Sequence, residues 1–581
     1  MTKQSENRIC QNCKKDFVIE LDDFGFYEKI KVPPPTFCPE CRLIRRMVWR
    51  NERALYRRIC NLCNKNIITM YHESSPFPVY CRECWYGDTW DASSYGRSYD
   101  MTRPFFEQYK EFSNTVPRLA LWQRNGINCE YSNMVGESKN VYLSVSVVLD
   151  SENIFYSKAI DKSTDIVDCL NIKEGQSLYE NMEGEKNYNS QYLLLSRSCI
   201  DSYFLVDCVN CSNCALSSNL RNKEFYIRNR QCSKEEYSKE LEKLNLKSRT
   251  SREKLLKEFE EIKKNAIYRF GNIVRSVNST GNNLLNVKNC KKCFDMYTME
   301  NAKYCYRTFL SKDCMDTTFA MKSELLYEYT TGALNAYNVK FSFSADSVRN
   351  ADYTDFCINC SNIFGCISLK NKENAIFNKV YSKEEFIKLR AEIIKQMSNV
   401  PFIDKMGRIY EYGEFFPIEL SPWAYNETSA QEIFPITKEE AQKNGYSWRE
   451  PDKKDFNITI PADKIPDNID EVDKEILKEV LGCAHIGDCS HQCNIAFRIT
   501  DYEFKFYKKH SIPLPMLCQN CRYYERSKVM PALKLWHRNC ICGKENHFHG
   551  KEKCDIEFET AYAPDRPEIV YCEKCYQQEV Y

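Results

Sequence analysis

Short hydrophobic bursts, separated by polar turns, fill the middle of the chain and recur every ten to thirteen residues between Cys129 and Arg230. This spacing is too short for helical repeats and fits one strand plus one turn. We therefore expect a β-solenoid-like centre of stacked coils. Small Cys, Ser and Asn side chains should form ladders at the corners, because asparagine tolerates the left-handed conformation of tight turns. The bursts are Asn140-Val-Tyr-Leu-Ser, Glu152-Asn-Ile-Phe-Tyr, Asp165-Ile-Val-Asp-Cys, Gln191-Tyr-Leu-Leu-Leu and Asp201-Ser-Tyr-Phe-Leu.

Residues 276–397 repeat this pattern, which indicates an internal duplication. A shift of 149 positions superposes Cys208-Val-Asn-Cys-Ser-Asn on Cys357-Ile-Asn-Cys-Ser-Asn. The same shift places Ser233 on Ser382, and Lys-Glu-Glu follows each serine. Serine with glutamate three residues later is a capping box, so we predict that a helix ends each block.

The central cysteines are spaced closely enough for metal binding. However, the second copy does not preserve the spacing of Cys208, Cys211 and Cys214. We therefore favour buried core thiols for these cysteines and for Cys290 and Cys293, and keep metal binding as the alternative.

Both ends of the chain carry the same arrangement of paired cysteines. Sliding one end on the other by 480 positions needs no gap, so we infer that one module was duplicated. The matched residues are Cys13 and Cys493, Phe17 and Phe497, Phe24 and Phe504, Tyr27 and Tyr507, Pro33 and Pro513, Cys38 and Cys518, Cys41 and Cys521, and Cys60 and Cys540.

The sequence of the first module predicts a Cys-x-x-Cys turn, called a knuckle, followed by a hairpin and by a second cysteine pair at the start of a helix. Residues 17–21 and 24–32 are strand-like runs, and the good helix former 42–50 follows Cys38 and Cys41. This order predicts a treble-clef-like zinc finger, in which two knuckles supply four tetrahedral thiolates.

We predict four structural zinc ions, two in each terminal module, because four thiolates fill the coordination sphere of zinc. The expected ligands are Cys10, Cys13, Cys38, Cys41, Cys60, Cys63, Cys81, Cys84, Cys489, Cys493, Cys518, Cys521, Cys540, Cys542, Cys572 and Cys575. The last site is irregular, since a single residue separates Cys540 from Cys542. Nearby alternative ligands are Cys483, His485, His491, His547, His549 and Cys554.

The fold class we expect is mixed and β-rich, with a double zinc module at each end and a duplicated β-solenoid-like centre with helical insertions. The predicted units are an N-terminal zinc module 1–100, a helical connector 101–128, a first repeat block with a helical arm 129–275, a second repeat block with a terminal helix 276–400, a connector 401–480 and a C-terminal zinc module 481–581.

Composition agrees with a metal protein of several packed units. The chain has 581 residues, of which 43% are hydrophobic and 32 are cysteine, and its formal net charge is +1. Cysteines in Cys-x-x-Cys pairs in a chain this long favour metal over disulfides. The polar residues 1–8 lack the apolar stretch of a secretory signal and no long apolar run occurs, so we expect a cytoplasmic protein without a membrane partner.

A run of arginines after the first zinc site suggests a nucleic-acid surface. Arg42, Arg46, Arg50, Arg53 and Arg57 would share one face of a continuous helix, and Trp49 would add a stacking surface. RNA is slightly favoured over DNA. The alternative is that these arginines pair with acids elsewhere in the chain, including the acidic helix expected at 470–480.

Several distinctive runs resemble a large family of uncharacterised zinc-ribbon proteins from uncultured, small-genome bacteria. The runs are Phe37-Cys-Pro-Glu-Cys-Arg, Arg50-Asn-Glu-Arg-Ala-Leu-Tyr, Tyr80-Cys-Arg-Glu-Cys-Trp, Arg103-Pro-Phe-Phe-Glu-Gln, Tyr412-Gly-Glu-Phe-Phe-Pro and Tyr562-Ala-Pro-Asp-Arg-Pro-Glu-Ile-Val-Tyr-Cys. The resemblance implies the same architecture along the whole chain and carries no established activity.

Catalytic motifs for phosphate, dinucleotide, serine-nucleophile and His-Glu-x-x-His chemistry are absent from the sequence. We therefore expect a non-enzymatic zinc scaffold that binds nucleic acid and needs no small-molecule cofactor. Two alternatives remain: a protein-interaction scaffold that uses the solenoid surface, and a zinc-dependent hydrolase at the histidine-flanked C-terminal site.

Overall fold

In the middle of the chain, each run of about twelve residues forms one coil, and successive coils stack with their strands in parallel. Lys158 pairs in parallel with Leu170, and Leu170 pairs with Met182. A computed structural model, which describes residues 4–450, 452 and 456–581, shows that these coils build a curled parallel sheet. Each coil buries apolar side chains such as Ile154, Ile160 and Ile166 in its interior, and this burial stabilises the stacked strands.

Fifteen strands form this first curled sheet within the described residues. They are β7 (Gln123–Arg124), β8 (Asn133–Gly136), β9 (Lys139–Tyr142), β10 (Val145–Val148), β11 (Glu152–Phe155), β12 (Lys158–Asp161), β13 (Thr164–Val167), β14 (Leu170–Lys173), β15 (Gln176–Tyr179), β16 (Met182–Glu185), β17 (Tyr188–Leu194), β18 (Tyr203–Val206), β19 (Ser212–Ser218), β20 (Glu224–Ile227) and β21 (Arg230–Gln231).

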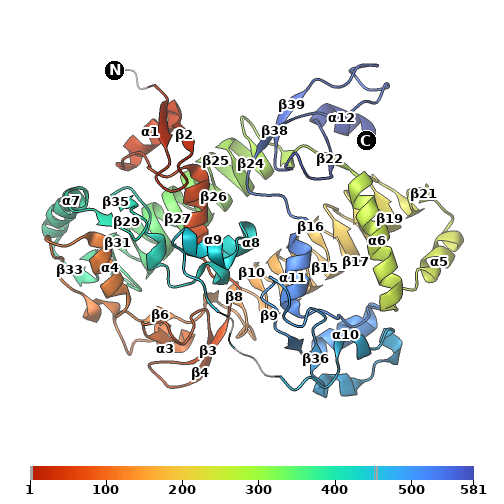
Figure 1. Cartoon of the computed structure of the whole chain (residues 1–581), viewed down its shortest axis with the longest axis horizontal. Helices are drawn as coiled ribbons and strands as arrows, with labels where there is room; N and C mark the ends of the chain where they lie inside the picture. The colour runs from red at the N-terminus through yellow and green to blue at the C-terminus, as the bar shows by residue number, and fades with distance from the viewer. Residues whose placement is uncertain (1–3, 451, 453–455) are drawn as a thin grey trace.

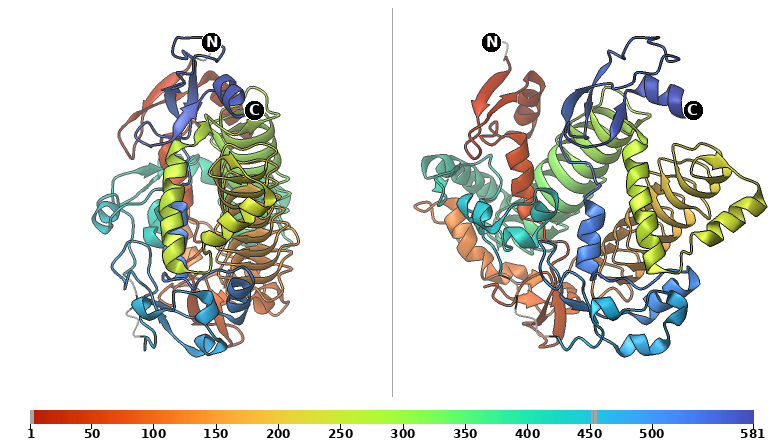
Figure 2. Two further views of the ribbon diagram at one scale, coloured as in Figure 1. Left: turned by 90° about the vertical axis from the view of Figure 1, so that its right-hand side faces the viewer. Right: turned by 45° about the vertical axis from the view of Figure 1, so that its right-hand side comes forward.

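A second curled sheet follows the same plan. Its strands are β23 (Ile273–Val274), β24 (Gly281–Lys291), β25 (Cys293–Lys303), β26 (Tyr306–Met321), β27 (Glu324–Leu334), β28 (Tyr337–Asp346), β29 (Arg349–Asp352), β30 (Asp355–Ile358), β31 (Ser361–Phe364), β32 (Glu373–Ile376) and β33 (Lys379–Val380). Figure 2 shows the two stacks of coils along the length of the molecule, the first in orange and yellow and the second in green.

Left-handed backbone recurs at about every third residue of both sheets, and asparagine occupies many of these positions. Asn128, Asn140 and Asn153 each have φ between 54° and 58°. Their side-chain amides donate along the stack, with 2.9 Å between Asn128 Nδ2 and Asn140 Oδ1 and 2.9 Å between Asn140 Nδ2 and Asn153 Oδ1. The expected asparagine ladders are therefore present.

Helices end both blocks where the serines predict them. Ser233 caps α5 (Lys234–Lys243) and Ser382 caps α7 (Lys383–Asn399), each with a complete capping box. A second helix of the first block, α6 (Arg249–Asn265), packs on β18 and β19, and α4 (Phe105–Ser113) packs its aromatic rings on the second sheet. The central cysteines lie in the coil interiors, as in the buried cluster of Cys199, Cys208, Cys211 and Cys214.

Short hairpins and helices build the terminal modules, and α11 (Gln519–Ser527) of the C-terminal module lies near the middle of the view in Figure 1. The N-terminal module contains β1 (Glu6–Ile9), β2 (Asp16–Ile19), α1 (Leu21–Ile30), α2 (Pro39–Val48), β3 (Tyr56–Ile59), β4 (Asn66–Thr69), β5 (Val79–Tyr80) and α3 (Arg82–Tyr86). The C-terminal module contains β36 (Leu481–Gly482), β37 (Ala496–Phe497), α10 (Asp501–Lys509), α11 (Gln519–Ser527), β38 (Trp536–Asn539), β39 (Glu557–Thr560), β40 (Ile569–Tyr571) and α12 (Glu573–Val580).

Three sequence predictions need correction here. Residues 24–32 are mostly helical in α1 instead of a strand, because Glu20 and Asp23 form a capping box and Phe24, Tyr27 and Ile30 bury one helical face. The arginine helix stops at Val48, as described below. The region 470–480 contains two 3-10 segments, η5 (Ile469–Glu471) and η6 (Lys474–Lys478), in place of an acidic α-helix.

The connector 401–480 contacts both terminal modules, and its segments η5 and η6 pack on α10. It contains α8 (Ser429–Ile433) and α9 (Lys438–Lys443), and α8 contacts α2. Phe416 of this connector stacks on Trp49, with ring centroids 4.7 Å apart.

Candidate metal centres

Two four-cysteine clusters lie in the N-terminal module. Cys10, Cys13, Cys38 and Cys41 form the first, and the ligand atoms all lie within 4.8 Å of one another. The Sγ atoms of Cys13 and Cys38 are 3.7 Å apart. A zinc–sulfur bond of about 2.3 Å gives a tetrahedral edge of about 3.8 Å, whereas a disulfide would require about 2.05 Å. The geometry therefore suits a metal ion.

The second cluster repeats the first. It contains Cys60, Cys63, Cys81 and Cys84, and the Sγ atoms of Cys63 and Cys81 lie 3.8 Å apart. In both clusters a backbone amide at the helix start donates to the first thiolate, over 3.2 Å from Cys38 N to Cys10 Sγ and 3.2 Å from Cys81 N to Cys60 Sγ. All eight ligands predicted for this module thus come together as two tetrads.

In the C-terminal module, Cys483 occupies the position for which the sequence suggested Cys489. The cluster contains Cys483, Cys493, Cys518 and Cys521. Cys483 Sγ accepts from the amide of Cys518 over 3.3 Å, which is the contact that Cys10 makes in the first module. The shift of 480 positions places Ser490 opposite Cys10, and the absence of a thiol there was the signal that another cysteine must supply this ligand.

The last cluster also differs by one residue from the predicted set. It contains Cys540, Cys554, Cys572 and Cys575, all of them buried. Cys554 Sγ lies 3.9 Å from Cys572 Sγ, close to the 3.8 Å between Cys63 Sγ and Cys81 Sγ. Cys542 lies beside this cluster, with its Sγ 3.1 Å from His547 Nδ1. The irregular spacing that we noted in the sequence is therefore explained by a longer loop to the second ligand.

Hydrogen bonds between neighbouring thiols lower the pKa of one cysteine in a cluster and raise the pKa of its partners, as for Cys38 beside Cys10. They hold the pKa of Cys10 far below its ordinary value, through Cys38 and Cys41. The pKa of Cys518 is lowered in the same way, by hydrogen bonds from Cys483 and Cys521. Both modules therefore contain a thiol that is readily deprotonated for metal binding.

The helix that carries each second cysteine pair also docks on a curled sheet. Cys38 caps α2 and Cys41 lies in its first turn, and Arg42 follows directly. Arg42 Nη2 lies 2.8 Å from Asp316 Oδ2, and Arg46 Nη1 lies 3.1 Å from Asp316 Oδ1 and 3.4 Å from Glu328 Oε2. Asp316 and Glu328 are twelve residues apart, so they lie on neighbouring coils of the second sheet.

The C-terminal module repeats this docking on the first sheet. Cys518 caps α11, and Arg522 Nε lies 2.9 Å from Asp168 Oδ2. Arg526 Nη2 lies 2.9 Å from Asp168 Oδ1, and its Nη1 lies 2.7 Å from Glu180 Oε1. Asp168 and Glu180 are again twelve residues apart. Each module thus uses two arginines, one helical turn apart, to hold two successive coils.

Aromatic contacts beside the arginines are duplicated as well. Tyr27 meets Tyr327 edge-on with centroids 5.6 Å apart, and Tyr507 meets Tyr179 edge-on at 6.1 Å. The pairing is crossed, because the N-terminal module docks on the second sheet and the C-terminal module on the first. Docking faces that recur at matching positions of both copies indicate that the duplication included the module–sheet interface.

The six residues predicted to bind nucleic acid are mostly inaccessible. Arg42, Arg46, Arg50 and Trp49 are at most 1% exposed. The helix ends at Val48, and Asn51 then forms a turn in which its Oδ1 accepts from the amide of Ala54 over 3.0 Å. Arg53 lies in the following loop over the ring of Tyr523, and Arg57 is exposed on β3. The alternative that we kept open, pairing with acids elsewhere, describes Arg42 and Arg46, although their acids are Asp316 and Glu328 rather than residues of the 470–480 region. Arg50 pairs with its neighbour Glu52.

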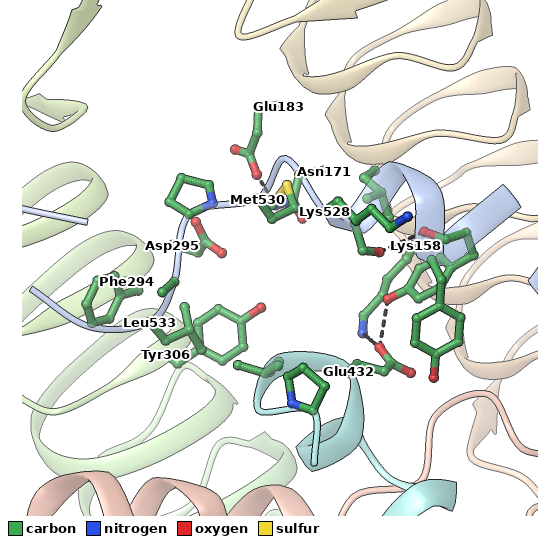
Figure 3. A pocket seen from close by; sticks show the side chains of 18 of the residues that line it. Lys158, Asn171, Glu183, Phe294, Asp295, Tyr306, Glu432, Lys528, Met530 and Leu533 are labelled. Atoms are coloured by element: carbon green, nitrogen blue, oxygen red, sulfur yellow. Dashed lines mark hydrogen bonds and ion pairs between the residues drawn. The ribbon is translucent and has the colours of Figure 1, made fainter. Parts of the chain in front are cut away.

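A cavity of about 430 Å³ separates the two curled sheets near α11 and α8 (Figure 3). Lys158 and Glu432 in its lining form an ion pair, 2.7 Å apart, as Figure 3 shows. Glu183 accepts hydrogen bonds from Asn171 and Asn283. Burial, together with repulsion from Asp295, raises the pKa of Glu183 to about 8. The cavity therefore lies within a polar contact region between the two sheets.

Comparison with protein-family models and with curated proteins found no match for the chain. Within the described residues, every helix is too short or too polar to cross a membrane.

Proposed function

We propose that the chain is a non-enzymatic scaffold in which structural zinc ions fix the two terminal modules on two β-solenoids. The observation that carries this proposal is the shared helix. In α2, the ligands Cys38 and Cys41 are followed within one turn by the docking residue Arg42 and, four residues later, by Arg46. Metal binding at the helix start thereby positions the docking arginines.

The four-cysteine clusters support a structural role. Tetrahedral sulfur coordination is typical of zinc, and four thiolates leave no position for a substrate. Such a site contributes on the order of 10 kcal/mol of apparent folding free energy. The cluster of Cys540, Cys554, Cys572 and Cys575 has only buried sulfur ligands, which argues against a hydrolytic zinc there.

For the partner, we propose another protein bound along the outer face of the coils. Asn338, Asn350, Asn362 and Asn374 present one amide per coil, joined by hydrogen bonds of 3.0 to 3.3 Å. Regular, extended faces of this kind suit extended protein ligands. Nucleic acid is less well supported, because of the six residues that suggested it only Arg57 is exposed.

Metal analysis of the purified full chain tests the proposal. We expect at least four zinc ions per chain, and we expect a strong chelator to lower the melting temperature and expose both modules to protease. Two or fewer bound ions in a folded chain would overturn it.

Nucleic-acid titrations separate the two partner classes. Single-stranded RNA and duplex DNA should bind weakly at low salt, with little change when Arg53 and Arg57 are both replaced by alanine. Tight binding that falls steeply with salt and is lost in that variant would favour nucleic acid instead.

A further inference from the structure

The loop between Cys483 and Cys493 carries more metal-binding side chains than its four-cysteine cluster uses. His485, Cys489 and His491 form a second group with Cys521, in which the ligand atoms all lie within 4.8 Å of one another. Cys489 Sγ lies 3.8 Å from Cys521 Sγ, which is the edge expected around one tetrahedral zinc ion. Two nitrogens and two sulfurs form a common zinc ligand set.

Cys521 belongs to both groups. Its sulfur lies 3.9 Å from Cys483 Sγ and 3.6 Å from Cys518 Sγ on one side, and 3.8 Å from Cys489 Sγ on the other. A thiolate has lone pairs for two metal ions, so one sulfur can serve both groups at once.

The two histidines need a partner that the described residues do not provide. The Nδ1 atoms of His485 and His491 are buried and lack a hydrogen-bond partner there. A buried polar atom without a partner destabilises the folded chain. His491 is held by stacking on Tyr524, with centroids 5.5 Å apart, and its Nδ1 lies 3.7 Å from Glu525 Oε1.

The N-terminal module offers a natural comparison. Only two residues, Gln11 and Asn12, separate Cys10 from Cys13, and neither is a histidine or cysteine. The extra ligands are therefore specific to the longer C-terminal loop. This loop is also more open, because His485, Cys489 and His491 are only partly buried. Cys489 borders a second cavity, of about 800 Å³.

We propose that His485, Cys489, His491 and Cys521 bind a second divalent ion of the zinc class, bridged through Cys521 to the ion of the neighbouring four-cysteine cluster. This ion is the more exchangeable of the two, since three of its ligands reach solvent or the cavity.

Zinc content of the full-length chain tests the site. We compare the wild type with the His485→Ala/His491→Ala double variant and with Cys489→Ser, using the exposed His537→Ala as a matched control. Each test variant should lose one zinc ion per chain relative to the wild type, and the control should lose none. Unchanged content in a folded double variant would overturn the proposal.

Cobalt substitution tests the bridge. Two cobalt ions that share a thiolate are magnetically coupled, so the wild type should show a weaker EPR signal per cobalt than Cys489→Ser. Equal signals per cobalt would overturn the shared ligand. The zinc scaffold proposed above and this second site are tested by different outcomes. Two or fewer zinc ions in the wild type would reject the scaffold. Four ions with no loss in the variants would reject the second site alone.

Discussion

Arg46 and Asp316 form an ion pair in the interior of the molecule, with 3.1 Å between Nη1 and Oδ1 and both side chains at 0% exposure. The arginine comes from α2, the helix that carries Cys38 and Cys41, and the aspartate comes from the second curled sheet. Arg526 and Asp168 repeat the pair between the other module and the other sheet, at 2.9 Å. Both modules are therefore attached to their sheets by buried charge.

Replacing Asp316 with asparagine should destabilise the chain strongly. The substitution leaves Arg42 and Arg46 buried without their shared carboxylate, and breaking a buried pair typically costs about 3–5 kcal/mol. Asp168→Asn should have an effect of similar size. Denaturant unfolding of the zinc-loaded protein measures both. Glu300→Gln, which removes an exposed ion pair with Lys288, is the control and should change stability by less than about 0.5 kcal/mol. An Asp316→Asn effect as small as this control would contradict the docking role.

Cys554→Ser should remove one zinc ion per chain, and Cys542→Ser should remove none. Cys554 lies within the last four-cysteine cluster, whereas Cys542 faces His547 beside it. Metal analysis and the melting temperature give the two readouts. The opposite result, with zinc lost only from Cys542→Ser, would restore the ligand set suggested by sequence spacing.

Local spacing identified the regular parts of the molecule. The capping serines Ser233 and Ser382 and the asparagine positions are set by contacts within a few residues or one coil, so the sequence predicts them. The eight N-terminal ligands follow for the same reason, because each Cys-x-x-Cys pair forms one knuckle.

The sequence alone did not predict features that depend on contacts between residues far apart in the chain. Cys483 lies ten residues before Cys493, and only the folded loop shows that it takes the place of Cys489. The arginine spacing after Cys41 predicts a charged helical face, but the sequence does not show that Asp316 and Glu328 cover that face from 274 and 282 positions away.

Raising the pH should lower the stability of the folded chain through Glu183, which lines the cavity between the two sheets. Burial and Asp295 raise the pKa of Glu183 from 4.5 to about 8, so the folded chain holds this proton more tightly than the unfolded chain. Stability from this group is present at low pH and is lost as the pH rises through about 8. Between pH 6 and 8.5 we expect Glu183→Gln to lose roughly 2 kcal/mol less stability than the wild type. The exposed Glu137→Gln should behave as wild type. Parallel pH curves for wild type and Glu183→Gln would refute the assignment.

Two substitutions of Asn350 distinguish the effect of backbone strain on stability from the effect of side-chain hydrogen bonding in the asparagine ladder. Its φ is 52°, a left-handed conformation that glycine adopts freely and that a β-branched residue resists. Asn350→Gly removes only the exposed amide contacts to Asn338 and Asn362, so it should cost about 1 kcal/mol or less. Asn350→Val removes the same contacts and adds strain of roughly 1–2 kcal/mol. Arg349→Val, at the adjacent exposed strand position, controls for the valine side chain and should be nearly neutral. Unfolding midpoints should therefore rank the variants as Arg349→Val, Asn350→Gly and Asn350→Val in order of falling stability. Equal midpoints for the two Asn350 variants would mean that the amide ladder, and not the left-handed corner, fixes asparagine at this position.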